Sequence, residues 1–517
     1  MVLNVRSERS RKPIFAITEP DTIMTRTVYS HLVEMIEAHA GKVALRFESE
    51  AMTYSDLAHA VDIATRQLTR LGLSKGATFA AYAQNCPELM IAYYAAARLG
   101  AVFVPLNPNL TAAEVEYAFQ HSGASVLFHD DLVGEAAGAA VPAEVLRPLR
   151  LLRSEATDLP MPEDVTVSPG DDFLIIYTSG STGVPKAILL DHAAQVGAAI
   201  ALAEMWGVTA EDVTLVGLPL GYLYGLSTAA AVGLQSGGTV VILRRFHPRN
   251  ILEALVSHRA TVYHGVPTMF SMMLEYCEQR DLTYDLSHIR VLICAGAPLP
   301  EEMQGRFAVR FKKMIQNYYA MTESTPVFGS FADDARQVPK GAVGRAAPGL
   351  QVRIIRQDGT ECDDNEDGEL LVRGAATMKR YLNNPDQTEA SFREGLFRTG
   401  DLGRRDADGF YYLTGRIKDI IIRGGANISP AEVEEVLASH PSVQDVAVVG
   451  GPDRIFGEVP IAFVVVRHGA STSQEDLIAH AEKTLSDFKV PRTIRFETKL
   501  PIGLTGKFDK KALKARL

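Results

Sequence analysis

The feature that most constrains the fold of this chain is an alternation of two kinds of segment up to about residue 415. Segments with apolar residues at helical spacing are followed by short apolar runs of strand length. This alternation is typical of parallel sheets whose faces are covered by helices. The sequence therefore predicts an α/β fold, with helices over 29–39, 54–71 and 87–99 and strands over 78–83, 101–105 and 125–129.

The pattern changes towards the C-terminal end. Residues 339–415 carry alternating runs that predict a β-rich subdomain, and residues 395–409 are dense in Gly, Asp and Arg. The remaining part, roughly 100 residues, predicts a compact α+β unit with helices over 430–440 and 474–485 and strands over 443–449 and 461–466. We therefore expect an N-terminal core over 1–416 and a small, mobile α+β lid domain over 417–517.

Length, charge and cysteine content exclude several classes of protein. The 517 residues are enough for two to four units of roughly 150 residues each. A net charge of -10 produces no general attraction to nucleic acid, so no such partner is expected. The cysteines form no CxxC pair, which is typical of a reducing compartment; they are Cys86, Cys277, Cys294 and Cys362.

A long segment without charge raises the question of a membrane span. Residues 213–243 carry no charged side chain, but they contain several glycines and Pro219, which interrupt an isolated spanning helix. We predict a buried core segment and no membrane span. No apolar run follows the basic N-terminal residues, so no signal peptide is predicted. We expect a cytoplasmic protein; the alternative is a peroxisomal one, because Ala515-Arg516-Leu517 loosely matches a peroxisomal address.

A loop dense in hydroxyl groups is the strongest local signal. It reads Tyr177-Thr178-Ser179-Gly180-Ser181-Thr182-Gly183-Val184-Pro185-Lys186. Its backbone N–H groups, hydroxyls and one ammonium group can surround a polyphosphate. It differs from a Walker loop, in which GK is followed by Ser or Thr. Because 173–177 and 187–190 both have strand patterns, the alternative is a polar hairpin that binds no ligand.

Four further motifs follow this loop. They are Tyr318-Tyr319-Ala320-Met321-Thr322-Glu323, Thr399-Gly400-Asp401, Gly415-Arg416-Ile417-Lys418-Asp419 and Leu504-Thr505-Gly506-Lys507. Each motif alone is short and unspecific. In this order and at these spacings, they make nearly the whole chain resemble the superfamily of adenylate-forming enzymes, which includes acyl- and aryl-CoA synthetases, peptide-synthetase adenylation domains and firefly luciferase.

The resemblance implies a binding site for ATP and Mg²⁺. Tyr319 would stack on adenine, Thr322 would donate to the α-phosphate, and Glu323 would be the magnesium ligand. Asp401 would accept hydrogen bonds from both ribose hydroxyls, and Arg416 would touch the ribose or phosphate edge. The β- and γ-phosphates would be held by the loop residues Thr178, Ser179, Gly180, Ser181, Thr182, Gly183 and Lys186. The alternatives are a surface position for Glu323, packing in the core for the Tyr319 ring, and a salt bridge inside a loop for Asp401 and Arg416.

Two reactions in one pocket require a moving lid. In the superfamily, the lysine that corresponds to Lys507 reaches the carboxylate and the α-phosphate during adenylation and then withdraws. The resemblance places the hinge at Lys418. Arg423, Gly424 and Gly425 would line the passage for the pantetheine of CoA; an ordinary glycine turn is the alternative there.

The pocket for the acid is less clearly defined by the sequence. Tyr222 stands where many acyl-CoA synthetases carry a histidine that gates the acid. No acidic residue occurs between Asp212 and Glu253, which disfavours an amino acid substrate. Other residues that the resemblance places at this pocket are His264, Gly265, Gly296, Ala297 and Ala320, and His264 is explained equally well as a core histidine.

The combined interpretation is an acid:CoA ligase that uses ATP, Mg²⁺ and CoA. It would form an acyl-adenylate and pyrophosphate, and then the acyl-CoA thioester. One alternative is an acyl-AMP ligase that passes the acid to a carrier-protein pantetheine. The other is a non-catalytic acyl or nucleotide sensor, which the intact Lys186, Glu323, Asp401 and Lys507 disfavour. The sequence leaves open which carboxylic acid is the substrate and whether the chain forms a homodimer.

Overall fold

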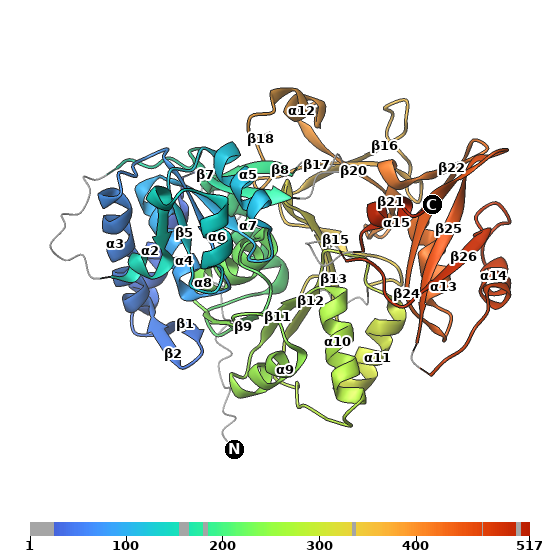
Figure 1. Ribbon diagram of the computed structural model, residues 1–517, viewed down its shortest axis with the longest axis horizontal. Coiled ribbons are helices and arrows are strands. Elements are labelled where there is room, and N and C mark those ends of the chain that lie inside the picture. The colour runs from blue at the N-terminus through green and yellow to red at the C-terminus, as the bar shows by residue number, and fades with distance from the viewer. Residues whose placement is uncertain (1–24, 155–164, 179–184, 333–337, 468, 503–507) are drawn as a thin grey trace, which may run out of the picture.

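The computed structural model describes residues 25–154, 165–178, 185–332, 338–467, 469–502 and 508–517 (Figure 1). The loop residues Ser179, Gly180, Ser181, Thr182 and Gly183 and the lysine Lys507 lie outside the described residues. Two large sheets form most of the N-terminal part, and a third sheet follows them along the chain. A fourth sheet lies at the opposite end of the molecule from the blue N-terminal strands and helices (Figure 1).

The two large sheets are parallel in their centres; the first is antiparallel at both edges, whereas the second is antiparallel at one edge and parallel at the other. Within the described residues, the first has nine strands, in the order β15 (Arg345–Ala346), β14 (Ser324–Gly329), β13 (Gln316–Met321), β12 (Val291–Cys294), β11 (Val262–Gly265), β9 (Val213–Val216), β10 (Thr239–Ile242), β1 (Val43–Phe47) and β2 (Glu50–Thr53). The second has seven described strands, in the order β18 (Arg380–Tyr381), β8 (Lys186–Asp191), β7 (Asp172–Thr178), β4 (Val102–Leu106), β3 (Thr78–Tyr82), β5 (Leu127–His129) and β6 (Leu146–Pro148).

Helices connect these strands and cover the sheets. The α-helices of the large part are α2 (Val28–His39), α3 (Tyr54–Arg70), α4 (Pro87–Leu99), α5 (Ala112–Ser122), α6 (Gly134–Ala140), α7 (His192–Trp206), α8 (Val232–Gln235), α9 (Pro248–Ser257), α10 (Pro267–Glu278), α11 (Glu301–Phe311) and α12 (Pro385–Ala390). The other helical segments are the 3₁₀ turns η1 (Ala143–Val145), η2 (Leu149–Arg153) and η4 (Ile417–Asp419) and the π-helix η3 (Tyr224–Ala231).

The main core lies between the two large sheets. Helices α4 and α7 are buried along most of their length, and they belong to a cluster that includes Phe103 of the second sheet and Val240 of the first. A helix that is apolar on all sides must be buried in this way. The charge-free segment 213–243 forms β9, η3, α8 and β10 in this interior, which confirms the predicted buried core. No helix within the described residues is long and apolar enough to cross a membrane.

The third sheet corresponds to the predicted β-rich subdomain, and the fourth sheet corresponds to the predicted α+β unit at the C-terminal end. Within the described residues, the third is antiparallel and contains β16 (Gln351–Ile355), β17 (Gly368–Arg373), β19 (Phe392–Arg393), β20 (Leu396–Arg405) and β21 (Tyr411–Arg416). The fourth contains β22 (Ile421–Arg423), β23 (Ala426–Ile428), β24 (Val443–Asp453), β25 (Gly457–Val466) and β26 (Thr493–Glu497). Its helices are α13 (Pro430–Ala438), α14 (Gln474–Glu482) and α15 (Lys510–Lys514).

The predicted elements agree with the observed ones to within a few residues, apart from the ends of β24 and β25. Strand β24 continues to Asp453 and β25 begins at Gly457, because their hairpin pairing extends both strands beyond the apolar runs. The chain leaves the third sheet at Arg416 and enters the fourth at Ile421, and a domain boundary between 416 and 417 stays a prediction. That this connection acts as a hinge stays a prediction. All four cysteines are free.

Candidate active site

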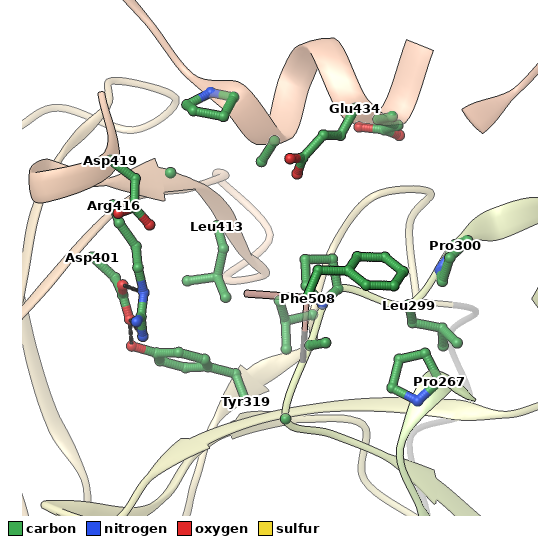
Figure 2. A pocket seen from close by; sticks show the side chains of 18 of the residues that line it. Pro267, Leu299, Pro300, Tyr319, Asp401, Leu413, Arg416, Asp419, Glu434 and Phe508 are labelled. Atoms are coloured by element: carbon green, nitrogen blue, oxygen red, sulfur yellow. Dashed lines mark hydrogen bonds and ion pairs between the residues drawn. The ribbon is translucent and has the colours of Figure 1, made fainter. Parts of the chain in front are cut away.

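A cleft of about 4120 Å³ separates the large part from the small C-terminal domain. Figure 2 shows Tyr319, Asp401 and Arg416 on one wall and Glu434 on the facing helix α13, with Phe508 between them. Arg467 of the small domain forms an ion pair with Glu302 of α11 across the cleft, and both residues border it. The cleft also brings together the predicted residues Thr178, Tyr222, Gly296, Ala297, Tyr319, Ala320, Asp401, Arg416 and Lys418.

A buried carboxylate is the electrostatic centre of the cleft wall. Asp401 on β20 is only 3% exposed, and its carboxylate accepts a hydrogen bond from the Tyr319 hydroxyl. The Nε atom of Arg416 lies 2.6 Å from Asp401 Oδ1. Strand pairing explains this contact, because Asp401 and Arg416 are direct partners in the antiparallel β20–β21 ladder. The guanidinium compensates the charge of a carboxylate that burial would otherwise disfavour.

The ring of Tyr319 is held on one side by the core. It stacks on Phe328 of the neighbouring strand β14, with centroids 5.6 Å apart and an interplanar angle of 23°. Phe328 in turn stacks on Tyr411 at 4.2 Å. Since Tyr319 also borders the cleft, the face opposite Phe328 is the one that can receive a planar ligand.

The hydroxyl-rich loop connects two paired strands, as the sequence predicts. Strands β7 and β8 are antiparallel, and Thr178 pairs with Lys186 across the base of the loop. Thr178 borders the large cleft, whereas Lys186 borders an adjoining hollow of about 120 Å³. The structure therefore brings both ends of the loop close to the cleft, and the residues between 178 and 185 lie outside its description.

Tyr381 connects two of the predicted site residues. Its hydroxyl donates to Glu323 Oε1 at 2.9 Å, and the Lys186 ammonium lies 4.9 Å from the centre of its ring. Burial raises the pKa of Tyr381, so the phenol stays protonated and remains a donor. Thr322 and Glu323 form the turn between β13 and β14, and neither borders the cleft in the described part of the chain.

The connection between the two parts is short. Ile417–Asp419 forms the 3₁₀ turn η4, which is closed by a hydrogen bond of 3.1 Å from Ile420 N to Arg416 O. The Lys418 side chain is exposed and borders the cleft.

Gly424 and Gly425 form the turn of the β22–β23 hairpin. Their φ angles of 57° and 90° lie in the left-handed region that glycine adopts readily, and two such residues are typical of a tight hairpin loop. The Arg423 guanidinium lies 4.9 Å from the Phe456 ring centre and donates to Phe488 O at 2.6 Å. In the described part of the chain, these three predicted CoA-binding residues do not border the cleft.

Tyr222 is one of the predicted acyl-pocket residues that border the cleft. It borders the cleft after Gly221, where an added Cβ would lie 2.5 Å from the backbone nitrogen of Asn107. Glycine is therefore required for this close approach. Burial raises the pKa of Tyr222 to about 12, and its hydroxyl interacts with the Asn107 side chain. Tyr222 is consequently a neutral phenol near pH 7.

His264 and Gly265 are placed differently from the acyl-pocket prediction. Both lie on the buried strand β11, and neither borders the cleft among the described residues. The His264 ring packs against Trp206 at 5.0 Å and against Tyr224 at 5.7 Å. The sequence explained His264 equally well as a substrate contact and as a core histidine. The structure places it in the core, because strand β11, which carries it, is buried along its full length.

Comparisons with known proteins give the family. The model of the AMP-binding enzyme family matches residues 32–382, and that of the AMP-binding enzyme C-terminal domain matches residues 432–507. The chain belongs to the AMP-binding enzyme family. This confirms the resemblance to adenylate-forming enzymes and makes ATP and CoA the co-substrates and acid:CoA ligation the activity.

Relatives within the family differ in the acids they are named for. A feruloyl-CoA synthase from Amycolatopsis sp is 34% identical over 92% of this chain and 95% of the relative. A long-chain-fatty-acid–CoA ligase from Bacillus subtilis is 30% identical over 94% of each chain. The ATP-bound structure of MatB from Rhodopseudomonas palustris is 29% identical, with a TM-score of 0.86 over 95% of this chain and 99% of MatB. The TM-score against apo MatB is 0.77, so the chain is arranged more like the ATP-bound form.

Sequence reasoning missed Tyr381 as a site residue of this AMP-binding enzyme. It lies 58 residues from Glu323 and in a two-residue strand, so neither spacing nor periodicity points to it. The strand joins the sheet edge because Arg380 and Tyr381 pair with Leu189 and Ile188 of β8. Only its contacts with the distant residues Glu323 and Lys186 connect Tyr381 to the predicted site.

The buried His264 predicts a pH dependence of stability. Burial lowers its pKa to about 3, below the ordinary value of 6.5, so the unfolded chain binds a proton that the folded chain excludes. Its contribution to stability is complete above pH 6.5 and is lost as the pH falls towards the folded pKa, by up to ~1.4 kcal/mol per pH unit. We expect the unfolding free energy of His264→Leu, measured with urea, to fall less steeply between pH 6.5 and 4.5 than that of the wild type. Equal slopes would contradict this assignment.

Proposed function

We propose that this chain activates a carboxylic acid with ATP at the cleft wall formed by Tyr319, Asp401 and Arg416, and then transfers the acyl group to CoA. The carboxylate oxygen of the acid attacks the α-phosphorus, the bond to the bridging oxygen breaks, and pyrophosphate leaves. The CoA sulfur then attacks the acyl carbon, and AMP leaves with the electron pair of the broken C–O bond. The observation that carries this proposal is the buried Asp401 carboxylate at the cleft.

Asp401 is suited to hold the ribose of ATP. Each carboxylate oxygen has two acceptor positions. Oδ2 accepts from the Tyr319 hydroxyl and, at 3.4 Å, from Arg416 Nη2, and Oδ1 is paired with Arg416 Nε. One ribose hydroxyl could bond to the position that remains on Oδ1, and the second could replace the long contact of Arg416 on Oδ2. Adenine would then lie over the exposed face of Tyr319, next to the same carboxylate.

The first step brings two anions together, so positive charge is needed around the phosphates. Lys186, at the base of the hydroxyl-rich loop, and Lys507 would supply part of it. One carboxylate oxygen of Glu323 is bonded to Tyr381, and no residue of the described part of the chain bonds to the second, which fits a Mg²⁺ ion shared with phosphate oxygens rather than held by protein ligands alone. When bound, the ion would neutralise charge on the departing pyrophosphate.

The second step requires a different surface near the adenylate. We propose that a rotation at Lys418 withdraws Lys507 and brings the Arg423, Gly424 and Gly425 turn towards the cleft. The exposed glycine turn has no side chain that would obstruct a narrow pantetheine chain. In the described arrangement this turn does not border the cleft, so it could reach the adenylate only after such a movement.

Pyrophosphate release tests the proposal. The purified protein would be assayed with a panel of aliphatic, aromatic and dicarboxylic acids, each with and without CoA. We expect acid-dependent pyrophosphate release, and acyl-CoA only when CoA is present. Acceleration by a phosphopantetheinylated carrier protein but not by CoA would identify an acyl-AMP ligase. Nucleotide or acid binding without pyrophosphate release would identify a sensor.

Glu323→Gln tests the proposed magnesium ligand. Loss of one anionic ligand should raise the Mg²⁺ concentration for half-maximal adenylation by roughly tenfold, while saturating Mg²⁺ restores part of the rate. Tyr381→Phe is the matched control, because it removes the hydrogen bond to Glu323 but keeps the carboxylate. We expect a smaller shift in this variant. A wild-type magnesium titration for Glu323→Gln would contradict the assigned role.

A further inference from the structure

One ion pair joins the two parts of the molecule across the cleft. The guanidinium of Arg467, directly after β25, contacts the carboxylate of Glu302 near the start of α11. Among the described residues, no other ion pair connects the chain up to Arg416 with the chain from Ile421 onwards. The side chains of Arg467 and Glu302 are 24% and 43% exposed, so water screens their attraction only in part.

Arg467 lies among carboxylates from both parts. Asp445 on β24 and Glu275 on α10 border the same cleft. Burial and the nearby Glu275 carboxylate raise the pKa of Asp445, and the Arg467 guanidinium opposes this rise. Arg467 therefore attracts Glu302 and also offsets the repulsion between Glu275 and Asp445. We call these four residues the cross-cleft charge cluster; Arg306, 3.8 Å from Glu302, belongs to the same helix as Glu302.

A second group of charges at the cleft shows the contrast. Lys340 forms an ion pair of 2.7 Å with Glu301, and both residues belong to the large part. Glu435 of α13 lies near this pair: burial and Glu301 raise the pKa of Glu435, and Lys340 opposes the rise. Because Lys340 and Glu301 already neutralise each other, this group attracts the small domain only weakly.

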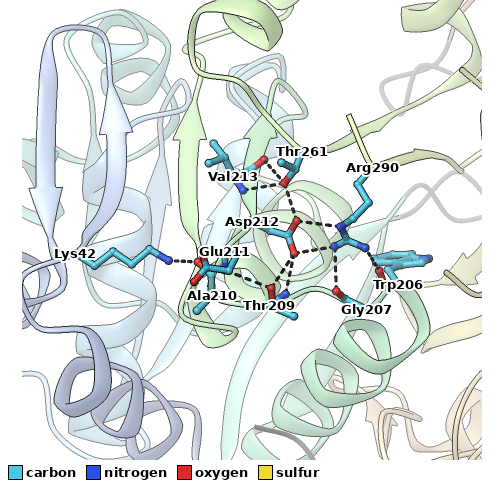
Figure 3. Close-up of polar contacts among 10 residues, drawn as sticks. All are labelled: Lys42, Trp206, Gly207, Thr209, Ala210, Glu211, Asp212, Val213, Thr261 and Arg290. Atoms are coloured by element: carbon cyan, nitrogen blue, oxygen red, sulfur yellow. Dashed lines mark hydrogen bonds and ion pairs between the residues drawn. The ribbon is translucent and has the colours of Figure 1, made fainter. Parts of the chain in front are cut away.

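The carboxylates of the large part stand on a fixed base. Helices α10 and α11 follow strands β11 and β12, and Figure 3 shows a polar network that ties the beginnings of these strands together. Arg290, directly before β12, forms an ion pair of 2.7 Å with Asp212 and donates to Trp206 O at 2.8 Å. Asp212 also accepts from the Thr261 hydroxyl, directly before β11, at 2.7 Å. A change in the cross-cleft charge cluster should therefore move the small domain at the connection 416–421 and leave α10 and α11 in place.

We propose that the cross-cleft charge cluster is a latch that sets the balance between the two domain arrangements of the catalytic cycle, with Arg467 holding the observed arrangement and Asp445 weakening it. This inference rests on the proposed function, in which the small domain must leave this arrangement before CoA transfer. The observed arrangement is closer to ATP-bound than to apo MatB, so it is the one assigned to adenylation. A partly exposed ion pair changes an equilibrium only a few fold, which suits a contact that must break in every turnover.

Two single substitutions should shift this balance in opposite directions. Arg467→Ala removes the attraction and leaves Glu275 and Asp445 facing each other, so we expect the ratio of the observed arrangement to the other one to fall at least threefold. Asp445→Asn removes the repulsion, and we expect this ratio to rise about twofold. In the double variant, Asp445→Asn should restore part of the population that is lost with Arg467. A merely structural role for these residues would not produce effects of opposite sign.

Distances between two spin labels on the full-length protein measure the two populations without any substrate. The labels are attached at Val309→Cys on α11 and Glu475→Cys on α14, which are exposed positions, after Cys362→Ser removes the one cysteine that is not buried. Arg495→Ala is the matched control, because this exposed arginine of β26 does not border the cleft among the described residues. Its population ratio should equal that of the wild type.

Single-turnover rates test the consequence for catalysis. Arg467→Ala should slow pyrophosphate release and speed acyl-CoA formation from supplied acyl-adenylate, each about threefold, and Asp445→Asn should do the reverse. Label distances that stay unchanged, or that shift in the same direction in both variants, would overturn the latch whatever the activity. Opposite shifts without these rate changes would overturn its place in the catalytic cycle. Opposite shifts in a protein that releases pyrophosphate with none of a broad set of acids would overturn the proposed function and leave the latch standing.

Discussion

Replacing Lys507 with alanine is expected to slow adenylate formation roughly 100-fold or more, while thioester formation from supplied acyl-adenylate stays close to the wild-type rate. The proposed role of this ammonium group is to offset the repulsion between the carboxylate and the α-phosphate. That repulsion exists only before the acyl–phosphate bond forms. Loss of the charge should therefore act on one half-reaction.

The two half-reactions can be measured separately. Pyrophosphate release in a single turnover reports adenylation, and acyl-CoA formation from synthetic acyl-adenylate reports the transfer. Lys499→Ala is a suitable control, because Lys499 is an exposed lysine from the same end of the chain. It should leave both rates unchanged. An equal loss in both half-reactions of Lys507→Ala would contradict a role confined to adenylation.

Replacing Lys418 with proline is expected to leave adenylation largely intact and to reduce CoA transfer by several orders of magnitude. Proline fixes φ near −65° and removes a backbone N–H, so a rotation at this residue would be restricted. Lys418 lies in the 3₁₀ turn Ile417–Asp419, and the φ range typical of 3₁₀ turns includes the φ of proline, which favours retention of the observed arrangement. Because this arrangement is closer to ATP-bound than to apo MatB, we expect the ATP-dependent step to survive.

The matched control for this experiment is Lys418→Ala. It removes the same side chain but keeps the backbone freedom, so CoA transfer should stay near the wild-type rate. Circular dichroism would show whether both variants keep the fold. Wild-type rates for both steps in Lys418→Pro would contradict the hinge at this position, and with it the proposed CoA surface at Gly424 and Gly425.

Local patterns in the sequence predict most of the secondary structure. Helix α3 follows its predicted range because a Thr53–Asp56 capping box starts it and an apolar stripe packs it against the core. The β7–β8 hairpin follows from two apolar runs on either side of a hydroxyl-rich loop. In both elements, the determining residues are neighbours in the chain, so the signal is visible without a structure.

The direction of several strands at the sheet edges could not be predicted from the sequence. Alternating helices and strands predict parallel sheets, yet β2, β14 and β18 pair antiparallel with their neighbours. These strands are short; β2 and β14 fold back on the strand that precedes each of them, whereas β18 pairs with β8 from far earlier in the chain. Strand direction at an edge therefore depends on which segments the fold brings together, and periodicity contains no information about that.

The family, the order of the motifs and the residue types needed for ATP chemistry can be inferred without a structure, because they depend on local composition and spacing. Which of those residues meet depends on the tertiary fold. It paired Asp401 with Arg416 across a ladder, joined Tyr381 to Glu323, and buried His264 beside Trp206. The physical reason is that hydrogen bonds, stacking and desolvation act over a few ångströms in space, whereas these partners are separated by 15 to 58 residues along the chain.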